Sequence, residues 1–248
     1  MTPAYDADLG DALAAGLHGP PPGDLAEFER MFTALVEAGH PDPATAWDSF
    51  YDRTLDRVLS GWDAPCGGGG TVACFTRIWV RAAALARGPS VLDVGSCFGF
   101  LPLAWATRSG HPRLLAVDLA PACAALAGRQ ARRLGRDVTA VCADGGALPL
   151  ADRAVATVLL LHVLEHMPPE ASDRLLQEAL RVADRRVVVA VPVEDLPDPL
   201  YGHVQVFDLA QLARLAQQTG WHASLADADG AWLILDRPGT NPPTTSDR

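Results

Sequence analysis

The chain has 248 residues, of which 49% are hydrophobic, so it can bury the core of one larger domain with an appended subdomain. Its formal net charge of −10 disfavours nucleic acid and anionic membrane surfaces as partners. It shows no secretion signal, no apolar run long enough to span a bilayer and no metal-ligand spacing among its five cysteines, so we expect a cytoplasmic protein with reduced thiols.

Residues 1–88 are predicted to form a helical cap over the rest of the chain. Residues 1–23 are small and polar and end in a proline-rich segment, which is typical of an irregular arm. Apolar residues at helical spacing then predict three helices, over Asp24–Ala38, Ala44–Ser60 and Thr71–Ala86. The glycine run Gly67–Gly70 indicates a flexible loop, or a hinge between this cap and a catalytic body. An acidic, aromatic-rich segment of this kind suits a lid over a substrate.

Residues 89–237 are predicted to form an α/β domain, because strand and helix patterns alternate along them. The expected strands are Val91–Val94, Leu114–Val117, Asp137–Cys142, Val155–Leu161, Arg186–Val191, His222–Ala226 and Ala231–Leu235. Helices are expected after Gly99 and over Pro121–Leu134, Glu170–Ala183 and Asp208–Thr219. This order predicts a mostly parallel sheet of seven strands with helices on both faces. The last two strands should form an antiparallel hairpin at one edge, followed by a disordered tail over 238–248.

The stretch Val91-Leu92-Asp93-Val94-Gly95-Ser96-Cys97-Phe98-Gly99 predicts a buried strand, a tight turn and the start of a helix. Its glycines let the backbone approach a ligand where a Cβ atom would clash. The helix that follows offers free N–H groups and the positive end of its dipole beside the turn. A nucleotide-binding turn is therefore expected. It is not the GxGxxG turn of dinucleotide sites, because Cys97 stands between two glycines four residues apart.

This turn resembles the first motif of the class I S-adenosylmethionine (SAM) methyltransferases, commonly D-x-G-x-G-x-G, with Cys97 in place of the middle glycine. A side chain there should be tolerable if its backbone φ is negative. Over Ser90–Asp236 the likeness continues with Asp118 and Asp144 after the second and third strands, then with Ala147-Leu148-Pro149-Leu150 and His162-Val163-Leu164-Glu165-His166-Met167. The last segment resembles the "LEH" motif of small-molecule methyltransferases. The resemblance implies a Rossmann-like methyltransferase fold, SAM as cofactor and a small-molecule acceptor.

The resemblance also implies roles for individual residues. Asp118 would hold the two ribose hydroxyls of SAM through charge-assisted hydrogen bonds. Asp144 would bind the adenine amino group, and Gly145 would permit close approach of the base. The cofactor-binding residues expected on this basis are Asp93, Gly95, Ser96, Cys97, Gly99, Asp118, Leu119, Asp144, Gly145 and His162.

Two histidines are candidate catalytic bases. A hydroxyl acceptor needs a base with a pKa near neutrality, which histidine supplies, whereas an amine acceptor needs only desolvation. His162 follows the fourth strand, and His203 lies between the fifth strand and the last large helix, where this fold receives its acceptor. Glu165 and His166 are expected to orient the loop rather than to act as bases.

No metal is expected. Some sugar O-methyltransferases hold Mg²⁺ through carboxylates. Three acids near the end of the fifth strand offer such ligands here, namely Glu194, Asp195 and Asp198. Because loop acids are commonly solvated, we expect no ion at them.

The acceptor has a narrower candidate. The segments VLDVGSCFGFLPL and YGHVQVFDLAQL, the absence of lysine and the helical N-terminal part look similar to methyltransferases of the mycofactocin pathway. That resemblance implies a glucose hydroxyl of an oligosaccharide-bearing redox cofactor as the nucleophile. A methyltransferase for another metabolite, such as a quinone, polyketide or amine, remains an alternative. So does a catalytically silent SAM-binding protein, because of Cys97. The oligomeric state is left open.

Overall fold

The structure is a computed structural model that describes residues 5–64 and 69–240. Among these residues, four helices precede the first strand: α1 (Leu9–Ala14), α2 (Leu25–Glu37), α3 (Pro43–Trp62) and α4 (Thr71–Leu85). The side chains of Asp24 and Asp42 accept hydrogen bonds from the backbone of the first turns of α2 and α3, so both helices begin at N-cap residues. The three predicted helices are confirmed. The division of the chain at residue 88 stays a prediction.

The predicted irregular arm over residues 1–23 is wrong at α1. Leu9 and Leu13 of this helix are 3% and 1% exposed and join the apolar cluster of α2, α3 and α5 (Phe100–Trp105). A helix of six residues is less than two turns long, so its apolar spacing shows no recognisable period. Gly67, Gly68 and the tail residues 241–248 lie outside the described residues, so the predictions that fall on them are not tested.

The body is a seven-stranded sheet in the order β3-β2-β1-β4-β5-β7-β6. Its strands are β1 (Ser90–Val94), β2 (Arg113–Asp118), β3 (Val138–Cys142), β4 (Val155–Leu161), β5 (Ala183–Val191), β6 (His222–Asp227) and β7 (Ala231–Asp236). The first five strands pair in parallel, and β7 pairs antiparallel with both β5 and β6. The predicted fold, with its antiparallel hairpin at one edge, is confirmed.

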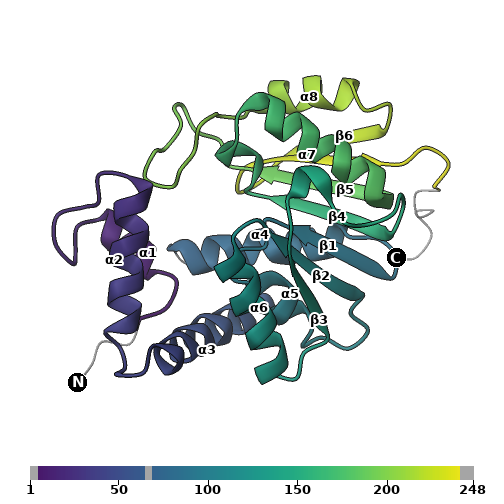
Figure 1. Ribbon diagram of the computed structural model, residues 1–248. Coiled ribbons are helices and arrows are strands. Elements are labelled where there is room, and N and C mark those ends of the chain that lie inside the picture. Colours follow the sequence, from purple (N-terminus) through teal and green to yellow (C-terminus); the bar gives the residue numbers. More distant parts are fainter. Residues whose placement is uncertain (1–4, 65–68, 241–248) are drawn as a thin grey trace.

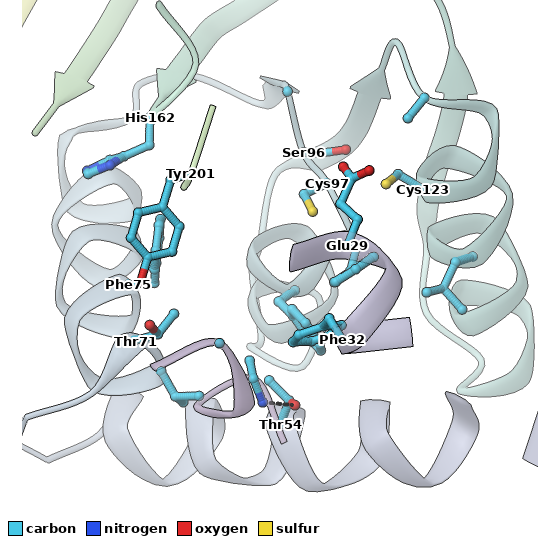
Figure 2. A pocket seen from close by; sticks show the side chains of 18 of the residues that line it. Glu29, Phe32, Thr54, Thr71, Phe75, Ser96, Cys97, Cys123, His162 and Tyr201 are labelled. Atoms are coloured by element: carbon cyan, nitrogen blue, oxygen red, sulfur yellow. Dashed lines mark hydrogen bonds between the residues drawn. The ribbon is translucent and has the colours of Figure 1, made fainter. Parts of the chain in front are cut away.

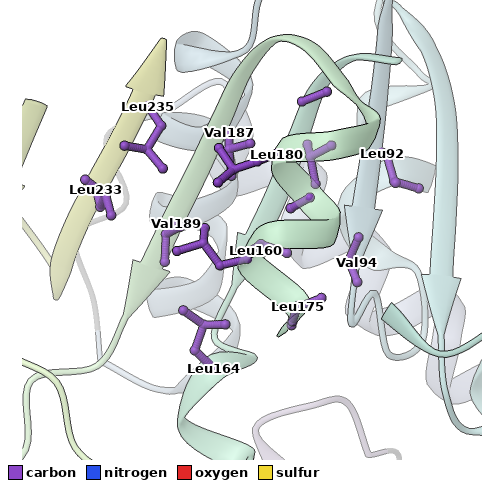
Figure 3. Close-up of a cluster of buried hydrophobic side chains, with 14 of the residues drawn as sticks. Leu92, Val94, Leu160, Leu164, Leu175, Leu180, Val187, Val189, Leu233 and Leu235 are labelled. Carbon is purple, nitrogen blue, oxygen red and sulfur yellow. The ribbon is translucent and has the colours of Figure 1, made fainter. Parts of the chain in front are cut away.

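Helices cover both faces of this sheet. They are α4, α5, α6 (Pro121–Arg133), α7 (Pro169–Val182) and α8 (Leu209–Gln217), with short 3₁₀ helices η1 (Gly145–Ala147) and η2 (Leu164–His166) after β3 and β4. Successive strand residues face opposite layers. Leu160 and Val189 pack with α7 and α8 in the cluster of Figure 3, whereas Leu159 and Val188 pack with α4 and α5 on the other face.

The N-terminal helices and the loop between β5 and α8 meet beyond the carboxyl ends of the strands. Figure 1 shows α1 and α2 standing to one side of the sheet, with this loop reaching toward α2. The rings of Phe28 on α2 and Tyr201 in the loop are 5.9 Å apart between centroids. Within the described part of the chain, every helix is too short or too polar to cross a lipid bilayer. The N-terminal helices and the β5–α8 loop cover the carboxyl edge of the sheet, where the strand order reverses between β1 and β4.

Candidate active site

The turn between β1 and α5 requires glycine at two positions. Gly95 and Gly99 have φ angles of 72° and 75°, in the left-handed region. A Cβ atom on Gly95 would lie 2.7 Å from Cγ2 of Val163, and one on Gly99 would lie 2.8 Å from Cβ of Ala127. The sequence predicts these glycines to allow close approach of a ligand. Packing against the neighbouring loop and α6 is an independent reason for them.

Cys97 does not have the negative φ angle at which the sequence predicts its side chain to be tolerable. Its φ angle is 48°. The reason is a hydrogen bond of 2.7 Å from the backbone N–H of Cys97 to Oδ2 of Asp118, which fixes the turn. Such a conformation costs about 1–3 kcal/mol in a residue other than glycine. A hydrogen bond with the Cys123 thiol raises the pKa of the Cys97 thiol well above its usual value.

Asp118 ends β2 and joins three segments. Besides the bond from Cys97, its Oδ1 accepts a 2.9 Å hydrogen bond from the backbone N–H of Ala120, which precedes α6. Its backbone carbonyl accepts from Ala143 at 3.0 Å, which ties β2 to the loop after β3. Each carboxylate oxygen still has acceptor capacity for a further donor. Leu119, beside it, is 70% exposed. This arrangement fits the predicted contact with a pair of ribose hydroxyls.

Asp144 caps η1 after β3. Its Oδ1 accepts a 2.8 Å hydrogen bond from the backbone N–H of Gly146. A Cβ atom on Gly145 would lie 2.7 Å from a methyl of Leu175 and 2.8 Å from one of Val94. Glycine is thus required at 145 by the packing of α7 on β1, whether or not a base approaches it. The role of Asp144 toward adenine stays a prediction.

Asp93 is an acid inside the sheet. It lies in β1 and is 6% exposed. Burial, and then the charge of Asp118, raises the pKa of Asp93 to about 8. The residue borders the cavity described next, so it is placed to respond to a ligand bound at the turn.

A cavity of about 1590 Å³ opens between the glycine turn, the N-terminal helices and the β5–α8 loop. Six of the predicted site residues line it: Asp93, Gly95, Ser96, Cys97, His162 and His203. Figure 2 shows Ser96, Cys97 and Cys123 on one side of this space, with His162 and Tyr201 on the other. The other predicted residues lie outside this lining, at the start of α5 and at or just after the ends of β2 and β3; they are Gly99, Asp118, Leu119, Asp144 and Gly145.

Eight aromatic side chains of the described residues line this cavity. They come from α2, α3, α4, the glycine turn, α5 and the β5–α8 loop, and comprise Phe28, Phe32, Trp47, Phe75, Trp79, Phe98, Phe100 and Tyr201. Their rings contact one another in edge-to-face, tilted and stacked pairs, for example Phe32 and Trp47 at 6.5 Å. A wall of this kind can bind an apolar skeleton or stack on the face of a sugar ring.

His162 and Glu165 lie next to each other in the lining of this cavity. Nδ1 of His162 lies 3.4 Å from Oε1 of Glu165. Neither carboxylate oxygen of Glu165, nor Nε2 of His162, has a hydrogen-bond partner among the described residues, although all three atoms are buried. Burial, followed by the charges of His203 and His166, lowers the pKa of His162 to about 4. Burial, followed by the charge of Glu194, raises the pKa of Glu165 to about 8.

His203 is held by an acid from the loop after β5. Its Nδ1 lies 2.8 Å from Oε2 of Glu194, within hydrogen-bond distance. Its ring centroid lies 4.9 Å from that of His166. The sequence predicts only loop-orienting roles for Glu165 and His166 and a solvated side chain for Glu194. A signal for this cluster was present, because their segments follow the neighbouring parallel strands β4 and β5, whose ends share one edge.

Comparison with known proteins identifies the fold. A family profile described as "Methyltransferase domain" matches residues 91–185. No curated protein matches the chain significantly in sequence. Magnesium protoporphyrin IX methyltransferase (ChlM) from Synechocystis PCC 6803 with bound SAH is similar, with 18% identity and a TM-score of 0.55 over 79% of this chain and 100% of that one. The same enzyme with bound SAM also matches.

Two further solved structures extend the comparison. A SAM dependent methyltransferase from Aquifex aeolicus is 17% identical, with a TM-score of 0.51 over 64% of this chain and 87% of that one. The [4+2]-cyclase SpnF is 21% identical, with a TM-score of 0.54 over 71% of this chain and 70% of that one. The protein therefore has the Rossmann-like class I methyltransferase fold, and its residues 91–185 are similar to the profile of a methyltransferase domain.

Proposed function

We propose that this protein is a SAM-dependent methyltransferase that acts on a hydroxyl group of a small-molecule acceptor. SAM, when bound, supplies a methyl group on a sulfonium; transfer forms a C–O bond, breaks the S–CH₃ bond and releases the hydroxyl proton. The observation that carries the proposal is that one cavity joins the Gly95–Cys97 turn to His203. A donor at the turn and an acceptor at the histidine would thereby share one enclosed space, which is what an in-line displacement requires.

The strand ends supply the groups that the donor needs. Asp118 would accept hydrogen bonds from both ribose hydroxyls. Each of its carboxylate oxygens accepts one hydrogen bond from a backbone N–H and can accept another. Asp144 would face the adenine amino group. The turn from Gly95 to Cys97 would lie beside the methionine end, where Asp93 also borders the cavity.

His203 fits the acceptor hydroxyl better than His162 does. With Nδ1 of His203 bound by Glu194, its Nε2 is free to act on a bound group. The pKa of His162, lowered to about 4, makes that residue a weak proton acceptor at neutral pH. A histidine placed like His203 can activate a hydroxyl in two ways. It can accept the proton, or it can hold a cation that lowers the pKa of the hydroxyl.

The acceptor is proposed from the walls of the cavity. Residues 1–88 would act as the cap, contributing rings such as Phe32 and Trp47. A sugar hydroxyl of a glycosylated cofactor such as mycofactocin is the narrower candidate, since aromatic faces bind sugar rings. The largely apolar lining equally favours a hydroxyl on a quinone or polyketide skeleton, which is the alternative class.

Methyl transfer and binding must be tested separately, because a cyclase is among the proteins that share this fold. Calorimetry with SAM measures binding, and methyl-labelled SAM with glucosylated acceptors, hydroquinones, phenols and amines measures transfer. We expect saturable binding and labelling of a hydroxyl acceptor. No binding would refute the proposal, and binding without transfer to any acceptor would favour a silent SAM-binding protein. Labelling of amines alone would replace the hydroxyl by a nitrogen nucleophile.

A further inference from the structure

We propose that Glu165, His166 and His203 form a binding site for a divalent transition-metal ion at the acceptor end of the cavity. One ligand atom from each residue lies within 4.8 Å of the corresponding atoms of the other two. All three residues line the cavity that reaches the glycine turn. From the sequence no metal is expected, and the acids that offer ligands there are Glu194, Asp195 and Asp198. The proposal arises from the three-dimensional arrangement of a different set of residues.

Glu165 is the residue whose surroundings favour a bound cation. Its side chain is 1% exposed, and both of its carboxylate oxygens are buried without a hydrogen-bond partner among the described residues. Burying a polar group without a partner costs free energy, and burying a carboxylate charge costs more. The nearest imidazole nitrogen, Nδ1 of His162, is 3.4 Å from Oε1 and does not satisfy the carboxylate. A cation bound to Glu165 would remove this cost.

His203 is oriented as a metal ligand. In protein metal sites a ligating histidine usually donates its other ring N–H to a carboxylate or carbonyl, which fixes the tautomer and leaves one nitrogen for the metal. Nδ1 of His203 makes this bond to Oε2 of Glu194 at 2.8 Å. Nε2 is then the nitrogen that can bind the ion. His166 is exposed, so the site can be reached from the cavity.

The two segments that carry these ligands are fastened to each other. The backbone N–H of Val204 donates to the carbonyl of Glu165 at 2.8 Å. The side-chain amide of Gln205 donates to the carbonyls of Leu164 and Met167 at 3.0 and 2.8 Å. These bonds hold the β5–α8 loop against η2, so His203 cannot move far from Glu165. Ligands around one ion lie about 3–3.5 Å apart, so binding requires side-chain shifts of only about 1 Å.

The donor set determines the class of ion. Two imidazoles and one carboxylate suit Mn²⁺, Fe²⁺, Co²⁺, Ni²⁺ or Zn²⁺, whereas Mg²⁺ and Ca²⁺ prefer oxygen ligands. Three protein ligands leave positions open for a further group. If the proposed function is right, that group is the acceptor hydroxyl, whose pKa the cation would lower. His203 would then act as a ligand rather than as a base.

Co²⁺ is the probe that tests the site, because its visible absorption reports coordination without any turnover. The full-length protein, stripped with EDTA and dialysed, is titrated with CoCl₂ and followed by absorption and equilibrium dialysis. We expect one Co²⁺ per chain and no intense thiolate charge-transfer band. Glu165→Gln and His203→Ala should each weaken binding at least about 100-fold, and Glu194→Gln about 10-fold. His222→Ala, in the exposed edge strand, should match the unmodified protein.

Several outcomes would overturn the site: no saturable Co²⁺ binding, unchanged affinity in Glu165→Gln and His203→Ala, or thiolate bands that place the ion on cysteine. Circular dichroism checks folding, and His166→Ala offers a ligand deletion at an exposed position should a buried variant not fold. Co²⁺ binding is measured without SAM or acceptor. Binding without methyl transfer would retain the site and refute the proposed function. Full methyl transfer by stripped protein that binds no Co²⁺ would refute the metal site and retain the proposed function.

Discussion

The backbone N–H of Cys97 donates a 2.7 Å hydrogen bond to the carboxylate of Asp118, 21 residues later in the chain. This bond joins the turn after β1 to the end of β2. It holds Cys97 at a φ angle of 48° and orients a carboxylate beside the cavity. The two residues that the sequence motif places in separate roles are therefore one structural unit, and substitutions at each should give different results.

Asp118→Ala should raise the dissociation constant for SAM by about tenfold to a hundredfold. The substitution removes the proposed acceptor of two ribose hydroxyls and also releases the turn at Cys97. Isothermal titration calorimetry measures the change. Asp137→Ala, at an exposed acid just before β3, is the matched control and should bind SAM as the unmodified protein does. Equal affinity in Asp118→Ala would remove the central residue of the proposed cofactor site.

Cys97→Gly should raise the free energy of unfolding by about 1 kcal/mol. Glycine relieves the left-handed strain, worth about 1–3 kcal/mol, and loses part of that gain to the entropy of the unfolded chain. Cys97→Ser removes the thiol but keeps the strain, so it should leave stability nearly unchanged. Urea unfolding of the three proteins compares them. A loss of stability in both variants would contradict this expectation and show that the thiol contact with Cys123 outweighs the strain.

Gly99→Ala should cost about 3 kcal/mol of unfolding free energy, and Gly110→Ala only about 1 kcal/mol. Both residues have nearly the same positive φ angle, 75° and 73°, so the backbone penalty is shared. A Cβ atom on Gly99 would meet Cβ of Ala127 at 2.8 Å, whereas nothing lies within 4 Å of one on Gly110. Denaturant unfolding measures the difference. Equal losses of unfolding free energy in the two variants would mean that α6 moves away from the added methyl group at no cost in free energy.

Asp93→Asn should change how stability depends on pH. The folded-state pKa of Asp93 is raised to about 8, so below that pH the folded protein keeps a proton that the unfolded chain has released. Stability is therefore lost as the pH rises, by up to about 1.4 kcal/mol per pH unit. Asparagine removes this contribution. Unfolding is measured without ligand at several pH values between 6.5 and 8. As the pH rises, the free energy of unfolding of Asp93→Asn should increase relative to that of the unmodified protein. A pH-independent difference would contradict burial of a protonated Asp93.

His203→Ala should lower kcat for methyl transfer by about 10²–10⁴-fold while leaving the dissociation constant for SAM unchanged. The reason is that His203 lies at the acceptor end of the cavity, and Glu194 holds its ring there. Glu194→Gln should have a smaller effect, because a neutral amide can still orient the imidazole. His222→Ala is the control for loss of a histidine. Full activity in His203→Ala would move acceptor activation to another residue.

Much of the fold follows from local patterns. The run Val155–Leu161 is apolar because β4 is buried on both faces, and all seven of its residues are buried. Asp24 and Asp42 mark helix starts because their carboxylates satisfy free N–H groups of the next turn. Alternation of strands with helices then restricts the topology to a parallel sheet. Helix α1 could not be predicted in this way, because six residues are too few to show a helical period.

The site was only partly within reach of the sequence. Its side of the sheet follows from topology, since β1, β2, β4 and β5 all end at one edge. The φ angle of Cys97 does not, because a carboxylate on another strand sets it. The pairing of His203 with Glu194, and their approach to Glu165, depend on backbone bonds between two loops. Local residue types thus determine helices, strands and the binding edge, whereas long-range hydrogen bonds and burial decide which side chains meet there and how they ionise.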